Sequence, residues 1–397
     1  MAKNKKIIYF DYAATTPIDP RVAKETNFYL KKFFGNTMSL HNIGQAAKEV
    51  LEKDRQKIAD LVGAKSQEII FTSSATESNN LVLKGVAFQN KKKGNHIIIS
   101  SIEHDCILNS AEWLESEGFE ITRLKVDKNG LVDPKEVKKA IKKETILVSV
   151  IHASNEIGTI EPIEEIGKIC REKKNSQGIP YFHTDAAQTF GKIPIDVNKM
   201  NVDLLTASSH KIYGPKGAAF LFLKQGVKIT PLLHGGGHEF GLRSSTVNLP
   251  AIAGFTKAAE ICHAEMKEES IRLKKMRDKL IEGVLKNIPG SHLTGHLKNR
   301  LVNNASFWFQ FVEGESIIML LDSLAIAAST GSACSSNSLE PSHVLLALGL
   351  RPQEAHGSLR LSLGRWTTEK EIDYLLEKLP SVIENLRKIS PFKRRKM

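Results

Sequence analysis

The feature that most constrains the fold of this chain is a regular alternation of short apolar segments and helical patterns between residues 68 and 223. The apolar segments, such as residues 96–100 (HIIIS) and 146–152 (ILVSVIH), are nearly continuous runs. Strands of this kind are buried on both faces, and the helices between them carry the chain back across the sheet. We therefore predict an α/β fold with a mainly parallel sheet and helices on both of its faces. In such sheets, chemistry gathers where the strands end.

The length of the chain predicts a second domain. A chain of 397 residues exceeds the size at which one hydrophobic core usually keeps growing. The pattern changes near residue 261, after which a long amphipathic helix over residues 266–288 is expected. We predict a large α/β domain over residues 16–261 and a smaller α+β domain over residues 1–15 and 262–397.

Charge and cysteine usage exclude several classes of function. The net charge of +12 is spread over short lysine runs without a stripe of interleaved aromatic residues, which favours a solvated surface over nucleic-acid binding. The four scattered cysteines form no C-x-x-C pair, so no zinc knuckle is indicated, and free thiols fit a reducing compartment. No apolar segment is long enough to span a membrane, and the first residues lack a targeting pattern. We expect a cytoplasmic protein.

Residues 203–217 (DLLTASSHKIYGPKG) place a lysine in an unusual position. A short strand pattern ends in Ser208, His210 and Lys211, directly before a turn rich in glycine and proline. A lysine usually lies on a solvated surface. Among polar groups at a strand end, however, its amine can be kept neutral enough to attack a carbonyl, as a Schiff-base lysine must.

Pyridoxal phosphate chemistry requires such a lysine, a carboxylate for the pyridine nitrogen, a flat group against the ring and donors for the phosphate. Asp185, at the end of YFHTD, suits the carboxylate, although an ordinary helix N-cap explains it equally well. Ala75 and Thr76 join a strand to a helix whose free amides predict a phosphate cradle, and simple helix capping is compatible with the same residues. His104 could stack on the ring or be a lone surface histidine.

Further polar residues follow other strand ends. Ser208 and His210 could add phosphate donors. The side-chain amides of Asn155 and Gln188 could contact the cofactor hydroxyl, and the Asn155 amide could instead contact the substrate carboxylate. Arg360 lies on an otherwise apolar strand, where a substrate carboxylate could meet its guanidinium bidentately. A structural salt bridge is the alternative for Arg360.

Cys334 differs from the other three cysteines. It lies in the segment GSACSSNS at residues 331–338, whose small and polar residues predict an exposed loop. A thiol in such surroundings is better interpreted as reactive than as part of a core. Cys106, Cys170 and Cys262 lie in or beside helical or strand patterns, and we interpret them as inert packing.

Taken together, these residues closely resemble the cysteine desulfurases of the NifS/IscS type, within the class-V aminotransferases. The resemblance covers nearly the whole chain, and its motifs occur in family order: DYAATT at 11–16, ATE at 75–77, NEIG at 155–158, DAAQ at 185–188, HKIYGPKG at 210–217, HGGGHE at 234–239, GSAC at 331–334 and Arg360. It implies the fold type I of pyridoxal-phosphate-dependent transferases, which is aspartate aminotransferase-like. This fold has a seven-stranded sheet in the large domain, and here the small domain would carry the cysteine loop.

The resemblance also implies an activity and a set of roles. A homodimer would convert L-cysteine to L-alanine, form a persulfide on Cys334 and pass the sulfur to acceptor proteins such as an iron–sulfur scaffold. Lys211 would be the Schiff-base lysine, Asp185 the pyridinium partner and His104 the stacking residue. The remaining roles carried over are phosphate binding by Ala75, Thr76, Ser208 and His210, a contact of Thr246 with the neighbouring subunit's phosphate, cofactor contacts of Asn155 and Gln188, and substrate-carboxylate binding by Asn155 and Arg360. No resident metal is expected, although Cys334 could transiently ligate a cluster.

Three positions depart from the family pattern. Thr37 replaces a common proline, and Ser209 and Ser245 replace common glycines. Because glycine permits close backbone approach, we expect the serines to shift the phosphate site slightly. The nearest alternative functions are selenocysteine lyase or another class-V activity. A sulfur-carrier protein without turnover, or a basic nucleic-acid binder, would differ from all of these in showing no cofactor absorption.

Overall fold

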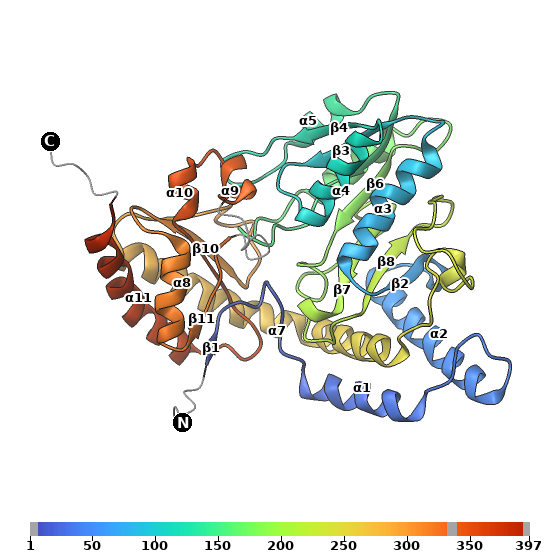
Figure 1. The fold of residues 1–397 in the computed structure, drawn as a ribbon, viewed down its shortest axis with the longest axis horizontal. Helices are drawn as coiled ribbons and strands as arrows, with labels where there is room; N and C mark the ends of the chain where they lie inside the picture. Colours follow the sequence, from blue (N-terminus) through green and yellow to red (C-terminus); the bar gives the residue numbers. More distant parts are fainter. Residues whose placement is uncertain (1–6, 332–339, 392–397) are drawn as a thin grey trace.

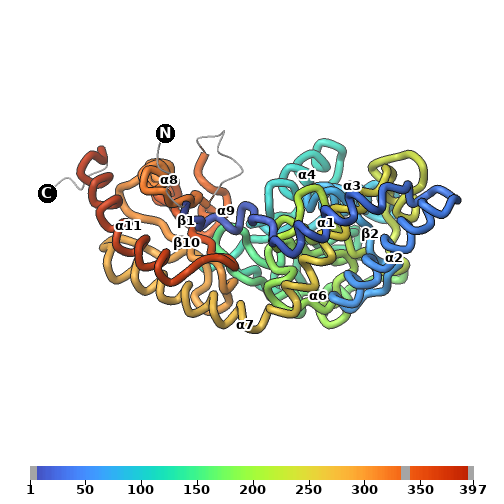
Figure 2. The backbone as a smooth tube through the Cα atoms, turned by 90° about the horizontal axis from the view of Figure 1, so that it is seen from below, coloured from blue at the N-terminus to red at the C-terminus, as the bar shows by residue number. Residues whose placement is uncertain are grey.

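A computed structural model describes residues 7–331 and 340–391 of the chain. A seven-stranded sheet with its helices forms the larger part, and two small sheets with further helices form the other part (Figure 1). Helix α7 (Leu249–Asn287) runs along both parts and connects them, as both views show (Figures 1 and 2).

The large sheet has the strand order β2-β8-β7-β6-β5-β3-β4. The neighbours from β7 to β4 pair in parallel, whereas β8 is antiparallel to both β7 and β2. The prediction of a mainly parallel seven-stranded sheet is therefore confirmed. The strands are β2 (Ile69–Thr72), β3 (His96–Ser100), β4 (Glu120–Leu124), β5 (Thr145–Ser149), β6 (Tyr181–Asp185), β7 (Leu204–Ser208) and β8 (Ala219–Leu223).

Both faces of this sheet are covered because its central strands are apolar on both sides. In β3, Ile98 packs into one hydrophobic cluster while Ile97 and Ile99 pack into another, since successive side chains point to opposite faces. The helices of this part, besides the first half of α7, are α1 (Pro20–Lys32), α2 (Asn42–Val62), α3 (Ala75–Asn90), α4 (Asp105–Ser116), α5 (Pro134–Ala140) and α6 (Ile163–Glu172), with the short 3₁₀ turns η1 (Ser66–Glu68), η2 (Ser209–Lys211) and η3 (Glu239–Gly241).

The second part contains an antiparallel sheet of order β12-β10-β9 and a parallel pair of β1 with β11. Because β1 comes from the start of the chain, the N-terminal segment passes from this part to the large sheet. The elements are β1 (Ile8–Tyr9), β9 (Ser291–Leu293), β10 (Asn304–Phe309), β11 (Ile326–Ala327), β12 (Ser358–Ser362), α8 (Gly314–Ser323), α9 (His343–Ala347), α10 (Pro352–His356) and α11 (Glu369–Ile389).

Helix α7 begins much earlier than the predicted residue 266. Asn248 caps it by accepting a hydrogen bond from the Ala251 amide, and Pro250 is tolerated in its first turn. The first half of the helix is apolar and buried on nearly all sides, so it lacks the amphipathic pattern by which the second half was recognised.

The buried residues of α7 divide between two cores. Those from Leu249 to Cys262 pack with the large sheet, and those from Leu273 to Val284 pack with the small one, where Phe10 joins them. We propose that these cores correspond to the two predicted domains, with one boundary inside α7. In the part of the chain that the structure describes, no helix combines the length and the apolar character needed to cross a membrane.

Candidate active site

A cavity of about 350 Å³ brings together most of the residues singled out by the sequence. It lies where strands of the large sheet end, and Arg360 and His343 from the C-terminal part of the chain also line it. The predicted site residues on its wall are Ala75, Thr76, His104, Asn155, Asp185, Gln188, His210, Lys211 and Arg360. Ser208 and Thr246 are not among its lining residues, and Cys334 lies outside the described residues.

Lys211 reaches this cavity because the chain tightens directly after β7. The 3₁₀ turn η2 ends at the lysine, and Tyr213 then takes a positive φ of 67°. The Lys211 Nζ donates to the backbone carbonyls of Ala13 and Ala14, each at 2.7 Å. The N-terminal segment is held there by Thr16, whose amide donates to the His210 carbonyl at 3.0 Å. The amine is therefore fixed in position by a segment almost 200 residues earlier in the chain.

Asp185 is the last residue of β6, and both of its carboxylate oxygens are oriented. Oδ2 accepts a hydrogen bond of 2.7 Å from the Asn79 side chain, and Oδ1 accepts one of 2.8 Å from the Ala187 amide. Its exposed fraction is 4%, so the carboxylate lies in a largely dry environment. A carboxylate held in this way can keep a proton on a ring nitrogen that lies within hydrogen-bonding distance of it.

The start of α3 forms one wall of the cavity. Ser74 caps the helix by accepting a hydrogen bond from the Glu77 amide at 3.1 Å, and Ala75 and Thr76 begin its first turn. The first amides of a helix lack intrahelical acceptors and attract anions. The Glu77 carboxylate nearby would repel an anion at this helix start. Arg243 pairs with that carboxylate at 2.7 Å and so offsets the repulsion. The arrangement can hold a phosphate.

His104 occupies the N-cap of α4. Its Nδ1 accepts a hydrogen bond from the Cys106 amide at 3.1 Å, which fixes the ring at the cavity wall. The Cys106 thiol also lines the cavity, at 3.2 Å from the same Nδ1 and from the Asn79 amide nitrogen. Cys106 is thus partly exposed to the site, although the sequence suggested inert packing.

Two further polar side chains hold the N-terminal segment against the cavity. The Gln188 Nε2 donates to the Ala13 carbonyl at 2.9 Å, and the His210 Nδ1 lies 3.1 Å from the Thr15 hydroxyl. Burial lowers the pKa of the His210 ring to about 4, so this ring is neutral near pH 7.

Arg360 forms the structural salt bridge that was one of its two predicted roles, and it also lies in the cavity lining. Its Nη2 pairs with Asp11 at 2.9 Å, and its Nη1 donates to the backbone carbonyl of Asn155 at 3.0 Å. Arg360 therefore takes part in a structural ion pair and also lines the cavity. Its Nε has no hydrogen-bond partner within the described residues. The Arg360 side chain is only 2% exposed.

Two buried glutamates, one in the cavity lining and one beside it, escaped the sequence analysis. Glu103 is fully buried, which raises the pKa of its carboxyl to about 8, and it accepts hydrogen bonds from Ser100 and the Ile151 amide. Glu156 accepts a hydrogen bond of 2.5 Å from Ser342, and burial raises its pKa. These glutamates adjoin His104 and Asn155 in sequence, which was the only available signal. Their partners, apart from Ser100, come from distant segments.

Two of the three sequence departures have structural consequences. Ser209 is fully buried and its hydroxyl has no partner within the described residues, while a Cβ on Gly214 would lie 2.1 Å from that hydroxyl. Ser245 has a φ of 152°, a region that glycine occupies more readily. Thr37 lies in a loop before α2, outside the cavity lining.

The cavity fits pyridoxal phosphate on its own chemistry. It combines a primary amine, a buried and oriented carboxylate, a fixed imidazole and a helix start, which are the groups that this cofactor needs. Within the described residues, no group of three or more histidine, cysteine, aspartate or glutamate side chains is placed to hold a metal ion.

Comparison with known proteins agrees with this chemistry. The aminotransferase class-V family matches residues 8–375. Cysteine desulfurase IscS 1 of Archaeoglobus fulgidus is 51% identical over 387 residues, which cover 98% of this chain and 100% of that protein. Among solved structures, a NifS-like protein is 38% identical with a TM-score of 0.89, covering 96% of this chain and all of its own. The structure described as SspA in complex with cysteine is 36% identical with a TM-score of 0.79, covering 91% of this chain and 100% of its own.

Proposed function

The chain belongs to the aminotransferase class-V family, and on that basis we propose that it is a cysteine desulfurase that converts L-cysteine to L-alanine. The observation that carries the proposal is that Lys211, Asp185 and Arg360 all line the same cavity. In this proposal, Lys211 supplies the reactive amine, Asp185 contacts the ring nitrogen of the cofactor, and Arg360 binds the substrate carboxylate. The relative named cysteine desulfurase, which is 51% identical, supports the choice of substrate.

The cofactor is pyridoxal phosphate, as in the class-V family. When bound, it supplies an electron sink that weakens the bonds at the substrate's α- and β-carbons. The residues that would hold it are Lys211 by a covalent bond, Asp185 at the ring nitrogen, His104 against the ring, and the helix start at Ala75 and Thr76 at the phosphate. Gln188 would donate to the ring oxygen from its Nε2.

The remaining steps belong to the protein's own side chains. Arg360 binds the substrate carboxylate, with Asn155 beside it, and thereby fixes the direction of the bonds at the α-carbon. In this proposal, Lys211 Nζ takes the proton from that carbon. Its hydrogen bonds to the carbonyls of Ala13 and Ala14 support this role, because they stabilise the amine when it is protonated.

The sulfur acceptor within the chain is, in this proposal, Cys334. Its thiolate attacks the substrate sulfur, the carbon–sulfur bond breaks with its electron pair left on carbon, and a proton completes L-alanine. The balance is one L-cysteine and one thiol giving one L-alanine and one persulfide, with no external oxidant or reductant. Gly331, the last described residue before this segment, lines the same cavity.

The test is an absorbance spectrum of the purified protein with and without L-cysteine, with L-alanine and sulfide measured in the presence of a thiol reductant. We expect a yellow protein that produces both products. Cys334→Ala should keep the colour and lose sulfide release, whereas Cys170→Ala, in the core, should keep both. A colourless wild-type protein, or undiminished sulfide release by Cys334→Ala, would contradict the proposal. L-selenocysteine used in parallel distinguishes a selenocysteine lyase.

We further propose a cytoplasmic homodimer that delivers sulfur to acceptor proteins such as an iron–sulfur scaffold. Large apolar side chains are exposed along the end of α1, the following loop and the start of α2, with Phe34 76% and Leu40 92% exposed. Such a patch suits a subunit interface, and the exposed loop that carries Thr246 could then reach a second subunit. Light scattering of wild type and Phe34→Asp tests the dimer, and a monomeric wild type would refute it. Free thiols favour a reducing compartment.

A further inference from the structure

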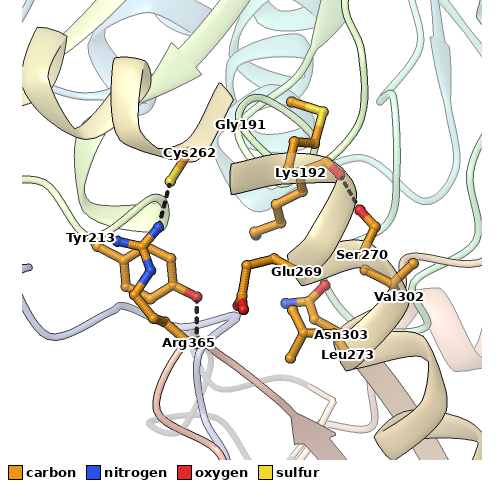
Figure 3. Close-up of a pocket in the computed structure, with 11 residues that line it drawn as sticks. Gly191, Lys192, Tyr213, Cys262, Glu269, Ser270, Leu273, Val302, Asn303 and Arg365 are labelled. Atoms are coloured by element: carbon orange, nitrogen blue, oxygen red, sulfur yellow. Dashed lines mark hydrogen bonds between the residues drawn. The ribbon is translucent and has the colours of Figure 1, made fainter. Parts of the chain in front are cut away.

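A second, smaller pocket lies near the active-site cavity, with room of about 30 Å³ (Figure 3). Residues from α7, the turn after Lys211 and the segment after β12 line it, together with Lys192. Lys192 follows Asp185 by one short turn, and its side chain enters this pocket (Figure 3). The proposed function gives Lys192 no task.

A chain of hydrogen bonds connects this pocket to the active site. The Lys192 Nζ donates to the Gln188 Oε1 at 3.3 Å, and the Gln188 Nε2 donates to the Ala13 carbonyl at 2.9 Å. That same carbonyl accepts a hydrogen bond from Lys211. Gln188 therefore stands between the two lysines, with its oxygen toward Lys192 and its nitrogen toward the N-terminal segment and the reactive amine.

The direction of the Gln188 amide matters because its two ends have opposite hydrogen-bonding character. An ammonium group has only donors, so it requires the amide oxygen on its side, and a carbonyl requires the amide nitrogen. Together, Lys192 and Ala13 permit one orientation. In that orientation, the second N–H of Gln188 remains to donate to an acceptor in the active-site cavity, which Gln188 lines.

We propose that Lys192 is a positioning residue that orients Gln188 as a hydrogen-bond donor to the ring oxygen of the cofactor. This inference rests on the proposed function, since it concerns how the cofactor is held. A donor at this oxygen favours its ionised form, and a nearby positive charge acts in the same direction. Lys192 thus lowers the affinity of the bound cofactor for protons through Gln188 and its own charge.

The electrostatic surroundings of Lys192 set the pH range in which it carries the charge that this role uses, namely below the pKa of its amine. Although part of its side chain is exposed, burial of the amine lowers its pKa to about 7, and the charge of Lys211 adds to the effect. The titratable and charged groups around the pocket come from three elements: Cys262 and Glu269 on α7, Lys211 and Tyr213 at η2 and after it, and Arg365 after β12. Glu269 pairs with Arg272 at 2.8 Å, and Arg365 pairs with Glu265 at 2.8 Å. Both of these charges are thereby engaged elsewhere.

The experiment is a pH titration of the visible absorption of the resting holoenzyme, without substrate. Lys192→Met removes donor and charge at similar length, and Lys192→Arg retains both. Lys199→Met is the matched control. The Lys199 side chain is 77% exposed, and its ion pair with Asp196 is long, at 3.9 Å, so its removal changes a surface charge and no buried contact. We expect the midpoint for Lys192→Met to rise by about one pH unit, a tenfold change in proton affinity. Lys192→Arg and Lys199→Met should retain the wild-type midpoint.

The outcomes separate this inference from the proposed function. An unchanged midpoint in Lys192→Met, or an equal shift in Lys192→Arg, would overturn the role of Lys192. A wild-type protein without any visible band would instead overturn the proposed function. If Lys192→Met does not fold, Lys192→Gln replaces it. Its shorter side chain should also raise the midpoint, and a wild-type midpoint in that variant would refute the role.

Discussion

Replacing Glu239 with glutamine tests how the glycine-rich segment at residues 234–241 is held. Glu239 and Arg55 form a bidentate pair at 2.6 and 2.8 Å, and both side chains are 2% exposed. Glu239 also accepts a hydrogen bond from the Phe71 amide at 2.7 Å. Glu239 and Phe240 both have positive φ values, 50° and 57°, which are unfavourable for side chains of this size.

The magnitude follows from the burial of the pair. Removing the Glu239 charge leaves the buried Arg55 guanidinium with only the half-exposed Glu52 carboxylate, 3.2 Å away, as an ion-pair partner. Breaking a buried ion pair in this way costs about 3–5 kcal/mol. Each left-handed residue costs on the order of 1–3 kcal/mol, and the contacts of Glu239 with Arg55 and with the Phe71 amide offset this strain. We therefore expect Glu239→Gln to lower the free energy of unfolding by about 3–5 kcal/mol. Glu260→Gln, which breaks the exposed pair of Glu260 with Lys57, should cost less than about 1 kcal/mol.

The assay is equilibrium urea unfolding followed by circular dichroism. Wild type is compared with Glu239→Gln and Glu260→Gln, and with Arg55→Met, Glu239→Leu and the double variant Arg55→Met/Glu239→Leu. The double variant should be less destabilised than the sum of Arg55→Met and Glu239→Leu measured alone, because no unpaired charge remains. A loss below about 1 kcal/mol in Glu239→Gln would refute the reasoning. So would strict additivity in the double variant.

Four further predictions concern single buried residues. Burial raises the pKa of Asp54 to about 7, whereas the carboxyl of the unfolded chain titrates near 4. The free energy of unfolding of wild type, compared with that of Asp54→Asn, should therefore fall as the pH rises from about 4 to 7. Urea unfolding at pH 8 should show a relative loss of a few kcal/mol. Asn79→Ala removes the 2.7 Å donor to Asp185, and dialysis followed by absorbance should show cofactor binding weakened about tenfold; wild-type retention would count against the role. Ser209→Ala removes a buried hydroxyl without a partner among the described residues, so its melting temperature should equal or exceed that of wild type. Gly214→Ala should lower the melting temperature, and Ser209→Gly should partly restore it.

The order of elements and the chemistry at the strand ends could be predicted because both depend on local patterns. A buried strand such as residues 96–100 is apolar over its whole length, and α11 (Glu369–Ile389) has a clear amphipathic repeat. Helix α7 was predicted too short, since its first half is buried all round and has no such repeat. Lys211, Asp185 and Arg360 were found because a charged residue at the end of, or within, an apolar strand requires a partner.

The contacts that make these residues a site depend on the tertiary structure alone. Nothing near Lys211 in the sequence indicates that the carbonyls of Ala13 and Ala14 hold its amine, or that Gln188 connects it to Lys192. The sequence determined which chemical groups stand at the sheet edge, because strand ends are specified locally. The tertiary structure decided which backbone atoms orient them, because segments far apart in the chain meet only when both cores have packed.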